Sequence, residues 1–340
     1  MRISGKLFPI LTGMIVLGFA CTNDIDLIEP GDPLPVVYCI LNPDVNEQFV
    51  RLGRTYLVDP SDPDAPPVMD STVWEVPVSV YIEEWMDGAP VNRFDFNPTI
   101  APPKDSGFFP IDNLRLFKVD FMPTRLAEYH IYVHFTDDSR IVTGAIKIPD
   151  QPGVIDPLDI PGRKINLQPG VQLTARWSPG ESRGIFQSRF IIQYTETIAG
   201  QMSVNQFILK KDPVLGLGAS IEMTDIYSGN RFMKAVLEQV PVKPGAERNI
   251  IQVQFLLHKS GEEMALQTSP YLQQTTISNT LNEYTNLING IGLFSSIQIV
   301  TVNNLVLSNT TLNELARNEL TDALGFRDIY GNDPQMAQHE

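Results

Sequence analysis

The stretch Tyr129-His130-Ile131-Tyr132-Val133-His134-Phe135 alternates large apolar residues with more polar ones. Successive side chains of a β-strand point to opposite faces, so this alternation predicts a strand with one buried face. Val78-Ser79-Val80-Tyr81-Ile82 repeats the pattern, and proline-rich segments separate such stretches. No helical periodicity of useful length occurs before residue 150. We therefore expect a mainly β protein that begins with an immunoglobulin-like antiparallel sandwich over residues 36–150.

The second half of the chain adds helical patterns to strands. Residues 151–161 contain Gln151-Pro152-Gly153 and Asp156-Pro157, which is typical of a linker, and we place a domain boundary near residue 152. Alternating apolar residues around Trp177, Phe190 and Val253 predict strands. We expect a β-rich α+β domain over residues 162–326 and a flexible tail over residues 327–340.

Two helices are predicted in this second domain. Thr311-Leu312-Asn313-Glu314 matches a capping box, with Leu315, Leu320 and Leu324 after it and Gly325 as the stop. This pattern predicts a C-terminal helix that begins at Thr311. A shorter helix is predicted within residues 261–274, although Pro270 interrupts it.

The first residues have the pattern of a secretory signal. Arg2 and Lys6 precede an apolar stretch over residues 7–19 that is too short to span a bilayer as a permanent helix. Ala20-Cys21 follows, and a cysteine after a small residue resembles the lipobox of bacterial lipoproteins. We expect residues 1–20 to be a removed signal peptide, Cys21 to carry a lipid, and residues 21–35 to be a tether. The alternative is an ordinary signal peptide that ends near a cysteine.

Composition limits the partners. The 340 residues carry a net charge of −15, and the loss of Arg2 and Lys6 with the signal makes it −17. Such a chain repels phosphate backbones and anionic headgroups, so we expect no nucleic-acid partner and membrane contact only through the N-terminal lipid. There are two cysteines. If Cys21 is acylated, Cys39 has no intramolecular mate and is most simply a small buried residue.

Four stretches carry a family resemblance: Val36-Val37-Tyr38-Cys39-Ile40-Leu41; Pro77-Val78-Ser79-Val80-Tyr81-Ile82; Tyr129-His130-Ile131-Tyr132-Val133 with residues 145–149; and Asn286-Leu287-Ile288-Asn289-Gly290-Ile291-Gly292-Leu293-Phe294. With them the chain resembles a Bacteroidota family of outer-membrane lipoproteins known as a domain of unknown function and commonly encoded beside TonB-dependent receptors. The resemblance implies a lipid-anchored accessory protein at the outer membrane, on its periplasmic face or at the cell surface. It implies a TonB-dependent receptor as partner and supplies no catalytic residue.

One motif has the residue types of a hydrolase. Gly180-Glu181-Ser182-Arg183-Gly184 matches the Gly-x-Ser-x-Gly nucleophile elbow, in which a strand-to-helix turn exposes the serine. The residues after it are predicted to form a strand, so a β-hairpin loop is the simpler interpretation of the glycines.

Two sets of residues have the side-chain types of metal ligands, and a third stretch has glycines like those of a phosphate-binding loop. His130 and His134 are about 13 Å apart on an extended strand, too far to share one ion, so we expect two imidazoles on the wetter sheet face. Asp59, Asp62 and Asp64 could bind calcium, but they lack the EF-hand spacing, and a solvated loop is the default. Asn289-Gly290-Ile291-Gly292 is interpreted as a tight turn.

The tryptophans give the candidate binding residues. Trp177 alternates with Leu173 and Ala175 and is predicted to be core. Trp74 and Trp85 flank a predicted strand; buried, they are core, and exposed, they could contact a glycan or a protein.

We therefore expect a protein that acts by binding, with no enzymatic activity, no cofactor and no metal, and that helps a TonB-dependent receptor capture or admit a nutrient. The ligand, be it a small molecule, a glycan or a peptide, is not identified by the sequence. The alternatives are a surface adhesion or structural module and, third, an esterase-like enzyme acting through Ser182.

Overall fold

The computed structural model describes residues 33–55, 78–100, 115–136, 140–218, 221–273 and 284–328. Cys21, Trp74 and the aspartates at 59, 62 and 64 lie outside these ranges. Most of the described chain is in strands, which confirms the predicted mainly β class. No helix in the described ranges is long and apolar enough to cross a membrane.

The first half of the described chain contains only strands: β1 (Pro35–Leu41), β2 (Glu47–Arg54), β3 (Val78–Met86), β4 (Ala89–Ile100), β5 (Arg115–Asp120), β6 (Glu128–Phe135) and β7 (Ile141–Lys147). The strands of the second half are β8 (Gly153–Asp156), β9 (Lys164–Ile165), β10 (Gln172–Ser178), β11 (Gly184–Ile198), β12 (Gln201–Lys210), β13 (Val214–Gly216), β14 (Met223–Ser228), β15 (Glu247–Ser260), β16 (Leu287–Ile288) and β17 (Ile291–Leu307). Its helices are α2 (Gly229–Gln239), α3 (Glu262–Gln273), α4 (Asn309–Arg317) and the short 3-10 helix η3 (Asp322–Leu324).

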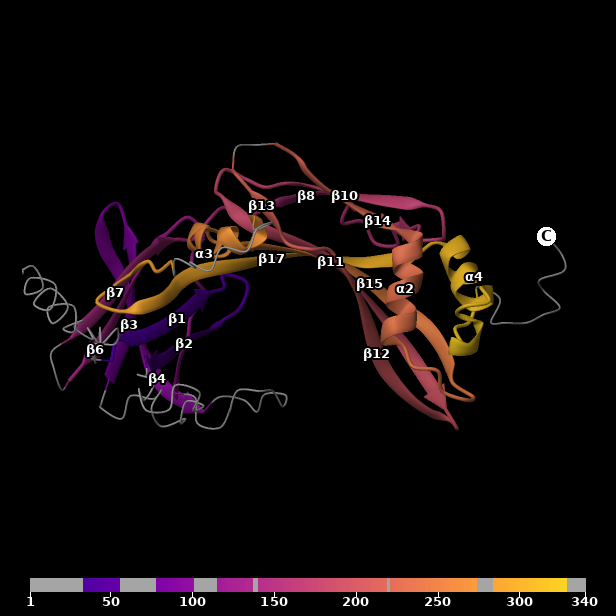
Figure 1. Ribbon diagram of the computed structural model, residues 1–340, viewed down its shortest axis with the longest axis horizontal. Helices are drawn as coiled ribbons and strands as arrows, with labels where there is room; N and C mark the ends of the chain where they lie inside the picture. The colour runs from indigo at the N-terminus through magenta and orange to yellow at the C-terminus, as the bar shows by residue number, and fades with distance from the viewer. Residues whose placement is uncertain are drawn as a thin grey trace, which may run out of the picture.

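One mixed sheet of 14 strands runs through both halves, in the order β12-β11-β15-β17-β1-β2-β5-β4-β3-β6-β7-β16, with β13 paired to β11 and β9 to β17. A separate sheet has the order β14-β10-β8. Figure 1 shows the first half and the second half at opposite ends of an elongated molecule, with β17 running between them.

The long strand β17 joins the two halves. Its first residues pair with β1 in parallel, from Val36 opposite Ile291 to Leu41 opposite Ser296. Its later residues pair with β15 in antiparallel fashion, from Ser260 opposite Ile297 to Val253 opposite Leu305. A strand from the predicted second domain therefore completes the sheet of the first, across the boundary predicted near residue 152. The β1–β17 pair is also parallel, whereas the pattern of the first half predicts antiparallel pairing.

The turn before β17 explains the distinctive stretch over residues 286–294. The side chain of Asn286 accepts from the N–H of Phe294 at 3.0 Å and donates to its carbonyl at 2.7 Å. Gly292 has φ of +119°, and a Cβ there would lie 2.1 Å from the carbonyl oxygen of Val37. Only glycine permits this close pairing of β17 with β1. The predicted turn is therefore confirmed only for Asn289 and Gly290, because Ile291 and Gly292 already belong to β17 and pair with β1.

Each half has its own hydrophobic core. Phe294 of β17 packs into the first core, while Val302, Leu305 and Leu307 of the same strand pack into the second. Cys39 is buried in the first core, where burial raises the pKa of its thiol well above the usual range. Trp177 is fully buried in the second core, as predicted.

The helices agree with the sequence only in part. α3 confirms the helix predicted within residues 261–274, but the predicted interruption at Pro270 is wrong, because the helix continues through it to Gln273. The predicted start of the C-terminal helix at Thr311 is wrong, because Ser308 is the N-cap and its side chain accepts from the N–H of Thr311. Thr311 is buried inside the helix, and its hydroxyl accepts from the N–H of Leu167 at 2.8 Å. α4 also ends at Arg317, before the leucines at 320 and 324.

Helix α2 is not predicted by the sequence analysis. Its N-cap Ser228 accepts from the N–H of Arg231, and Phe232, Met233 and Val236 form its buried side. That side covers β12 and β14 and closes the second core.

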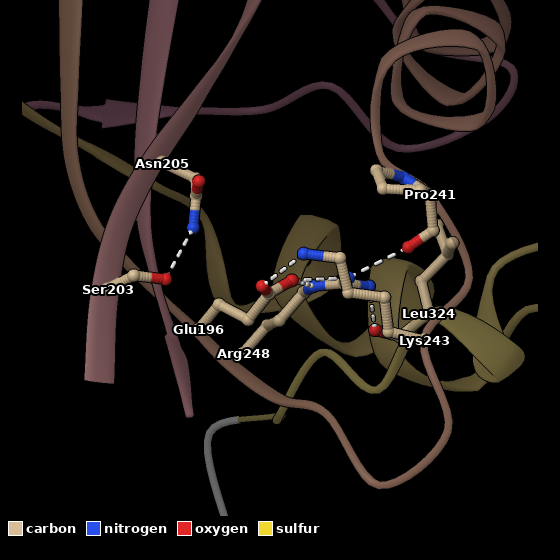
Figure 2. A network of polar contacts seen from close by, with 7 residues as sticks. All are labelled: Glu196, Ser203, Asn205, Pro241, Lys243, Arg248 and Leu324. Atoms are coloured by element: carbon tan, nitrogen blue, oxygen red, sulfur yellow. Dashed lines mark hydrogen bonds and ion pairs between the residues drawn. The ribbon is translucent and has the colours of Figure 1, made fainter. Parts of the chain in front are cut away.

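The end of the described chain is bound by a buried ion pair (Figure 2). The side chain of Arg248 is fully buried, and it donates to Glu196 Oε2 at 2.5 and 2.9 Å, to the carbonyl of Pro241 and to that of Leu324. Lys243 donates to the other oxygen of Glu196 at 2.6 Å. The N–H of Arg327, which the sequence places in the flexible tail, donates to the carbonyl of Arg248 at 2.9 Å.

We predict that Glu196→Ala lowers the free energy of unfolding by about 3 kcal/mol, because it leaves the Arg248 charge buried without a counterion. The hydrogen bond from Lys243 and the neighbouring Arg248 hold the pKa of Glu196 below its usual value. The stabilisation is therefore present at neutral pH and is lost as the pH falls through the carboxylate titration. Denaturant unfolding at several pH values measures both effects.

The matched control is Glu247→Ala, which removes the exposed partner of Arg327 and is expected to cost less than about 1 kcal/mol. Equal losses for the two variants would contradict the assignment of Glu196 as the buried counterion.

Candidate functional site

The Gly180–Gly184 motif lies in a loop between β10 and β11, and a strand follows it. It is not a hairpin loop, because β10 and β11 belong to different sheets. The hydroxyl of Ser182 donates to Asp150 Oδ1 at 3.1 Å, and a Cβ on Gly180 would lie 2.1 Å from Asp150 Oδ2. The glycine therefore lets the Asp150 carboxylate approach the loop.

Asp150 also neutralises a buried lysine. The Lys259 side chain is fully buried, and its Nζ donates to Asp150 Oδ1 at 2.9 Å, to the carbonyl of Asp150 at 3.0 Å and to that of Pro179 at 2.9 Å. All three ammonium hydrogens thus have acceptors. This arrangement joins β15, the chain after β7 and the loop of Ser182. It explains Gly180 and the position of Ser182 without a hydrolytic step.

We predict that Asp150→Asn destabilises the protein by about 3 kcal/mol, because Lys259 stays buried without its counterion. Partial burial raises the pKa of Asp150, but the hydrogen bonds from Lys259 and from the N–H of Glu181 outweigh it, so the net pKa is lowered. The stabilisation is present at neutral pH and disappears as the pH falls through the carboxyl titration.

The double variant Asp150→Asn with Lys259→Met is the control, since removing both charges is expected to recover much of the lost stability. Calorimetry or denaturant unfolding of the single and double variants measures the coupling. A double variant less stable than Asp150→Asn alone would contradict the buried pair.

The two histidines of β6 lie on its outward face, as expected from the alternation. The His130 ring stacks on Trp85, with centroids 4.5 Å apart and planes at 15°. The His134 ring stacks on Tyr81 at 5.5 Å and 24°. Within the described ranges, no three histidine, cysteine, aspartate or glutamate side chains are grouped as a metal site would need.

These rings belong to a larger surface, which we call the aromatic face. It consists of the outward residues of three adjacent strands: Tyr81, Glu83 and Trp85 of β3; Arg93 and Asp95 of β4; and Glu128, His130, Tyr132 and His134 of β6. The strand order β4-β3-β6 places the β3 residues in the middle. Trp85, one of the two predicted binding residues, is therefore half-buried within the aromatic face rather than in the core.

The register of the strands produces the stacking. Tyr81 lies opposite Tyr132, and their rings are 4.8 Å apart and inclined by 14°. Trp85 lies opposite Glu128, so His130 is its diagonal neighbour, within reach of a large ring. From β4, the Arg93 guanidinium lies 3.6 Å above the centre of the Tyr81 ring. The ring of Tyr81 is thus covered by Arg93 on one side and by Tyr132 on the other.

Charged neighbours fix these groups. Asp95 accepts from Arg93 Nη2 at 2.7 Å and from Nε at 3.0 Å, which helps to hold the guanidinium over Tyr81 and raises the pKa of Arg93. Partial burial raises the pKa of Tyr81 and of Tyr132 above the usual value. Both phenols therefore stay protonated at neutral pH and can donate hydrogen bonds.

The geometry of the aromatic face determines which groups are exposed to a binding partner. A sugar stacks on an open aromatic ring, but the Tyr81 ring is covered on both sides. What remains at the surface are ring edges, hydroxyls, an indole and a guanidinium. Tyrosine, tryptophan and arginine are the residues enriched at the energetic centres of protein–protein interfaces. The Tyr81 ring is therefore not open to a sugar, and the groups that remain at the surface are of the kinds common in protein interfaces.

A hollow lies between β4 and β5, lined by Asn97, Pro98, Thr99, Lys118, Val119 and Asp120. Its volume is about 240 Å³. Small-molecule sites measure about 300–1,000 Å³ and are mainly apolar, whereas Lys118 and Asp120 form an ion pair in this hollow. We assign it no ligand.

Sequence reasoning found Trp85 but missed Arg93, Tyr81 and Tyr132. The period of two showed which residues of each strand point outward. The pairing of β3 with β4 and β6 was needed to show that these residues stack on one another.

Comparison with models of protein families finds no matching family, and comparison with curated proteins finds no similar sequence.

Proposed function

We propose that the protein is a lipid-anchored binding subunit of the outer membrane, and that its aromatic face contacts a TonB-dependent receptor in nutrient uptake. The observation that carries the proposal is a pair of stacks on one outward sheet face, Arg93, Tyr81 and Tyr132 in one and Trp85 and His130 in the other. These rings are already fixed by their neighbours, so binding would cost little side-chain entropy. The signal and lipobox pattern of residues 1–21 and the family resemblance support the location and the partner.

For residues 36–150 we propose the immunoglobulin-like sandwich expected from the sequence. Two observations support it. β4 pairs through its first part with β3 and through residues 97–100 with β5, which lets the sheet bend at this strand. Side chains of β1, β2 and β5 and side chains of β3, β6 and β7 meet in one core.

We predict that Trp85→Ala and Tyr132→Ala reduce recovery of the receptor at least tenfold when the tagged protein is purified from outer membranes. A tenfold loss corresponds to about 1.4 kcal/mol, the size expected for a side chain at an interface centre. Mass spectrometry of the purified material identifies and quantifies any β-barrel receptor.

The matched control is Tyr38→Ala, an exposed tyrosine on β1, which is separated from β3 in the sheet by β2, β5 and β4. Recovery with Tyr38→Ala is expected to equal that of the wild type. Wild-type protein recovered without any receptor, or recovery unaffected by both aromatic-face variants, would contradict the proposal.

The anchor has its own test. Replacing Cys21 by serine removes the thiol that would be acylated, so the protein is expected to move from the membrane pellet to the soluble fraction. Fractionation with immunoblotting measures this, and mass spectrometry of the wild-type terminus shows the acyl chains directly. A Cys21→Ser protein that still sediments with membranes would contradict the proposed lipid anchor.

A further inference from the structure

β12 is the edge strand of the large sheet, and half of its outer edge is closed by a side chain. Gln239, the last residue of α2, accepts from the N–H of Ile208 at 2.9 Å and donates to its carbonyl at 2.8 Å. The side-chain amide thus occupies the position that a neighbouring strand would take. Such a cap blocks pairing with another chain at this point of the edge.

The other half of the edge is open. Backbone groups of a strand alternate in direction, so Met202, Val204 and Gln206 present their N–H and carbonyl groups to the same side as Ile208. No hydrogen bond from a described residue reaches these groups. The side chains of Met202 and Val204 are 70% and 62% exposed. Residues 201–207 contain no charge and no proline, the features that usually protect an edge.

The open groups are arranged symmetrically about Val204. A two-fold axis through Val204 would place it opposite Val204 of a second copy, and Met202 opposite Gln206. Each open residue would then both donate and accept a backbone hydrogen bond, as in an antiparallel hydrogen-bonded pair. Ile208 would fall opposite Gly200, in the turn after β11, so the Gln239 cap marks the end of the paired stretch.

The side chains are also compatible with this pairing. On one face Val204 would pack against its copy, with Met202 and Gln206 beside it. On the other face, Asn205 donates to Ser203 at 3.0 Å within one chain (Figure 2), and the two-fold pairing would place Ser203 opposite Asn205 of the second copy. No like charges would meet, because the nearest charged residue of β12 is Lys210.

We propose that the protein forms a symmetric dimer in which the β12 strands of two copies pair antiparallel about Val204 and join their sheets into one. A second copy fits this edge because its open groups are complementary to themselves. A two-fold interface uses the same patch on both partners, as this edge would. Figure 1 shows β12 at the lower border of the second half.

Native mass spectrometry of the full chain, released from detergent, tests the dimer. The wild type is expected at twice the mass of one chain. Val204→Lys places two ammonium groups opposite each other and is expected to raise the dissociation constant at least tenfold, giving monomer. Val242→Lys is the matched control, since Val242 is 63% exposed but lies outside β12, and it is expected to stay dimeric. Thermal unfolding of all three shows whether the fold is kept.

Disulfide formation tests the register. Residues opposite each other in an antiparallel hydrogen-bonded pair have Cα atoms about 5.5 Å apart, within the range of a disulfide. Val204→Cys is therefore expected to give a covalent dimer on oxidation, whereas Val242→Cys is not. Cys39 is buried and does not compete.

A monomeric wild type, a Val204→Lys protein that stays dimeric, or a Val242→Cys protein that cross-links as well as Val204→Cys would overturn the proposal. If β12 instead pairs with an extended segment of another protein, the purified chain would be a monomer in all of these measurements. Loss of receptor binding in the aromatic-face variants leaves this dimer unaffected, so the two proposals fail independently.

Discussion

The structure depends on one strand pairing with two partners of opposite direction. β17 lies parallel to β1 through residues 291–296 and antiparallel to β15 through residues 297–305. Because a backbone ladder is continuous along a strand, the two halves of the protein cannot separate without breaking it. The close approach at Gly292 and the side-chain clamp of Asn286 on Phe294 set the point at which β17 enters the first sheet.

Buried polar groups are concentrated where segments distant in sequence meet. Ser295, Ser296 and Gln298 are buried in β17 between its contributions to the two cores, and the side-chain amide of Gln298 donates to the carbonyl of Pro149 at 2.5 Å. In the same way, Lys259 binds a carbonyl of the chain after β7, and Arg248 binds a carbonyl of the C-terminal segment. These segments are not strands, so their carbonyls have no ladder partner, and apolar side chains packed against them would leave the carbonyls without hydrogen bonds. The buried cations supply those hydrogen bonds. The same few buried charges therefore stabilise the fold and hold segments together that are far apart in the sequence.

The two surfaces proposed for binding lie in different halves. The aromatic face is built on β3, β4 and β6, while the open edge belongs to β12 (Figure 1). A pair formed through β12 would carry its two aromatic faces at the far ends of one extended sheet. Two anchored copies could then present two receptor contacts, which raises the effective affinity without any new contact.

The sequence by itself determined the mainly β class, the core position of Trp177, the outward side of His130 and His134, and the helix within residues 261–274. These depend on local periodicity, which needs only the alternation of side chains along one strand or helix. Strand partners are set by contacts between residues far apart in the chain, which no local pattern contains. Only the tertiary structure therefore decided that β17 crosses to β1 and that Tyr81, Trp85 and Arg93 lie on one face. It also decided that Ser308 rather than Thr311 caps α4, because the Thr311 hydroxyl accepts from the N–H of the distant Leu167.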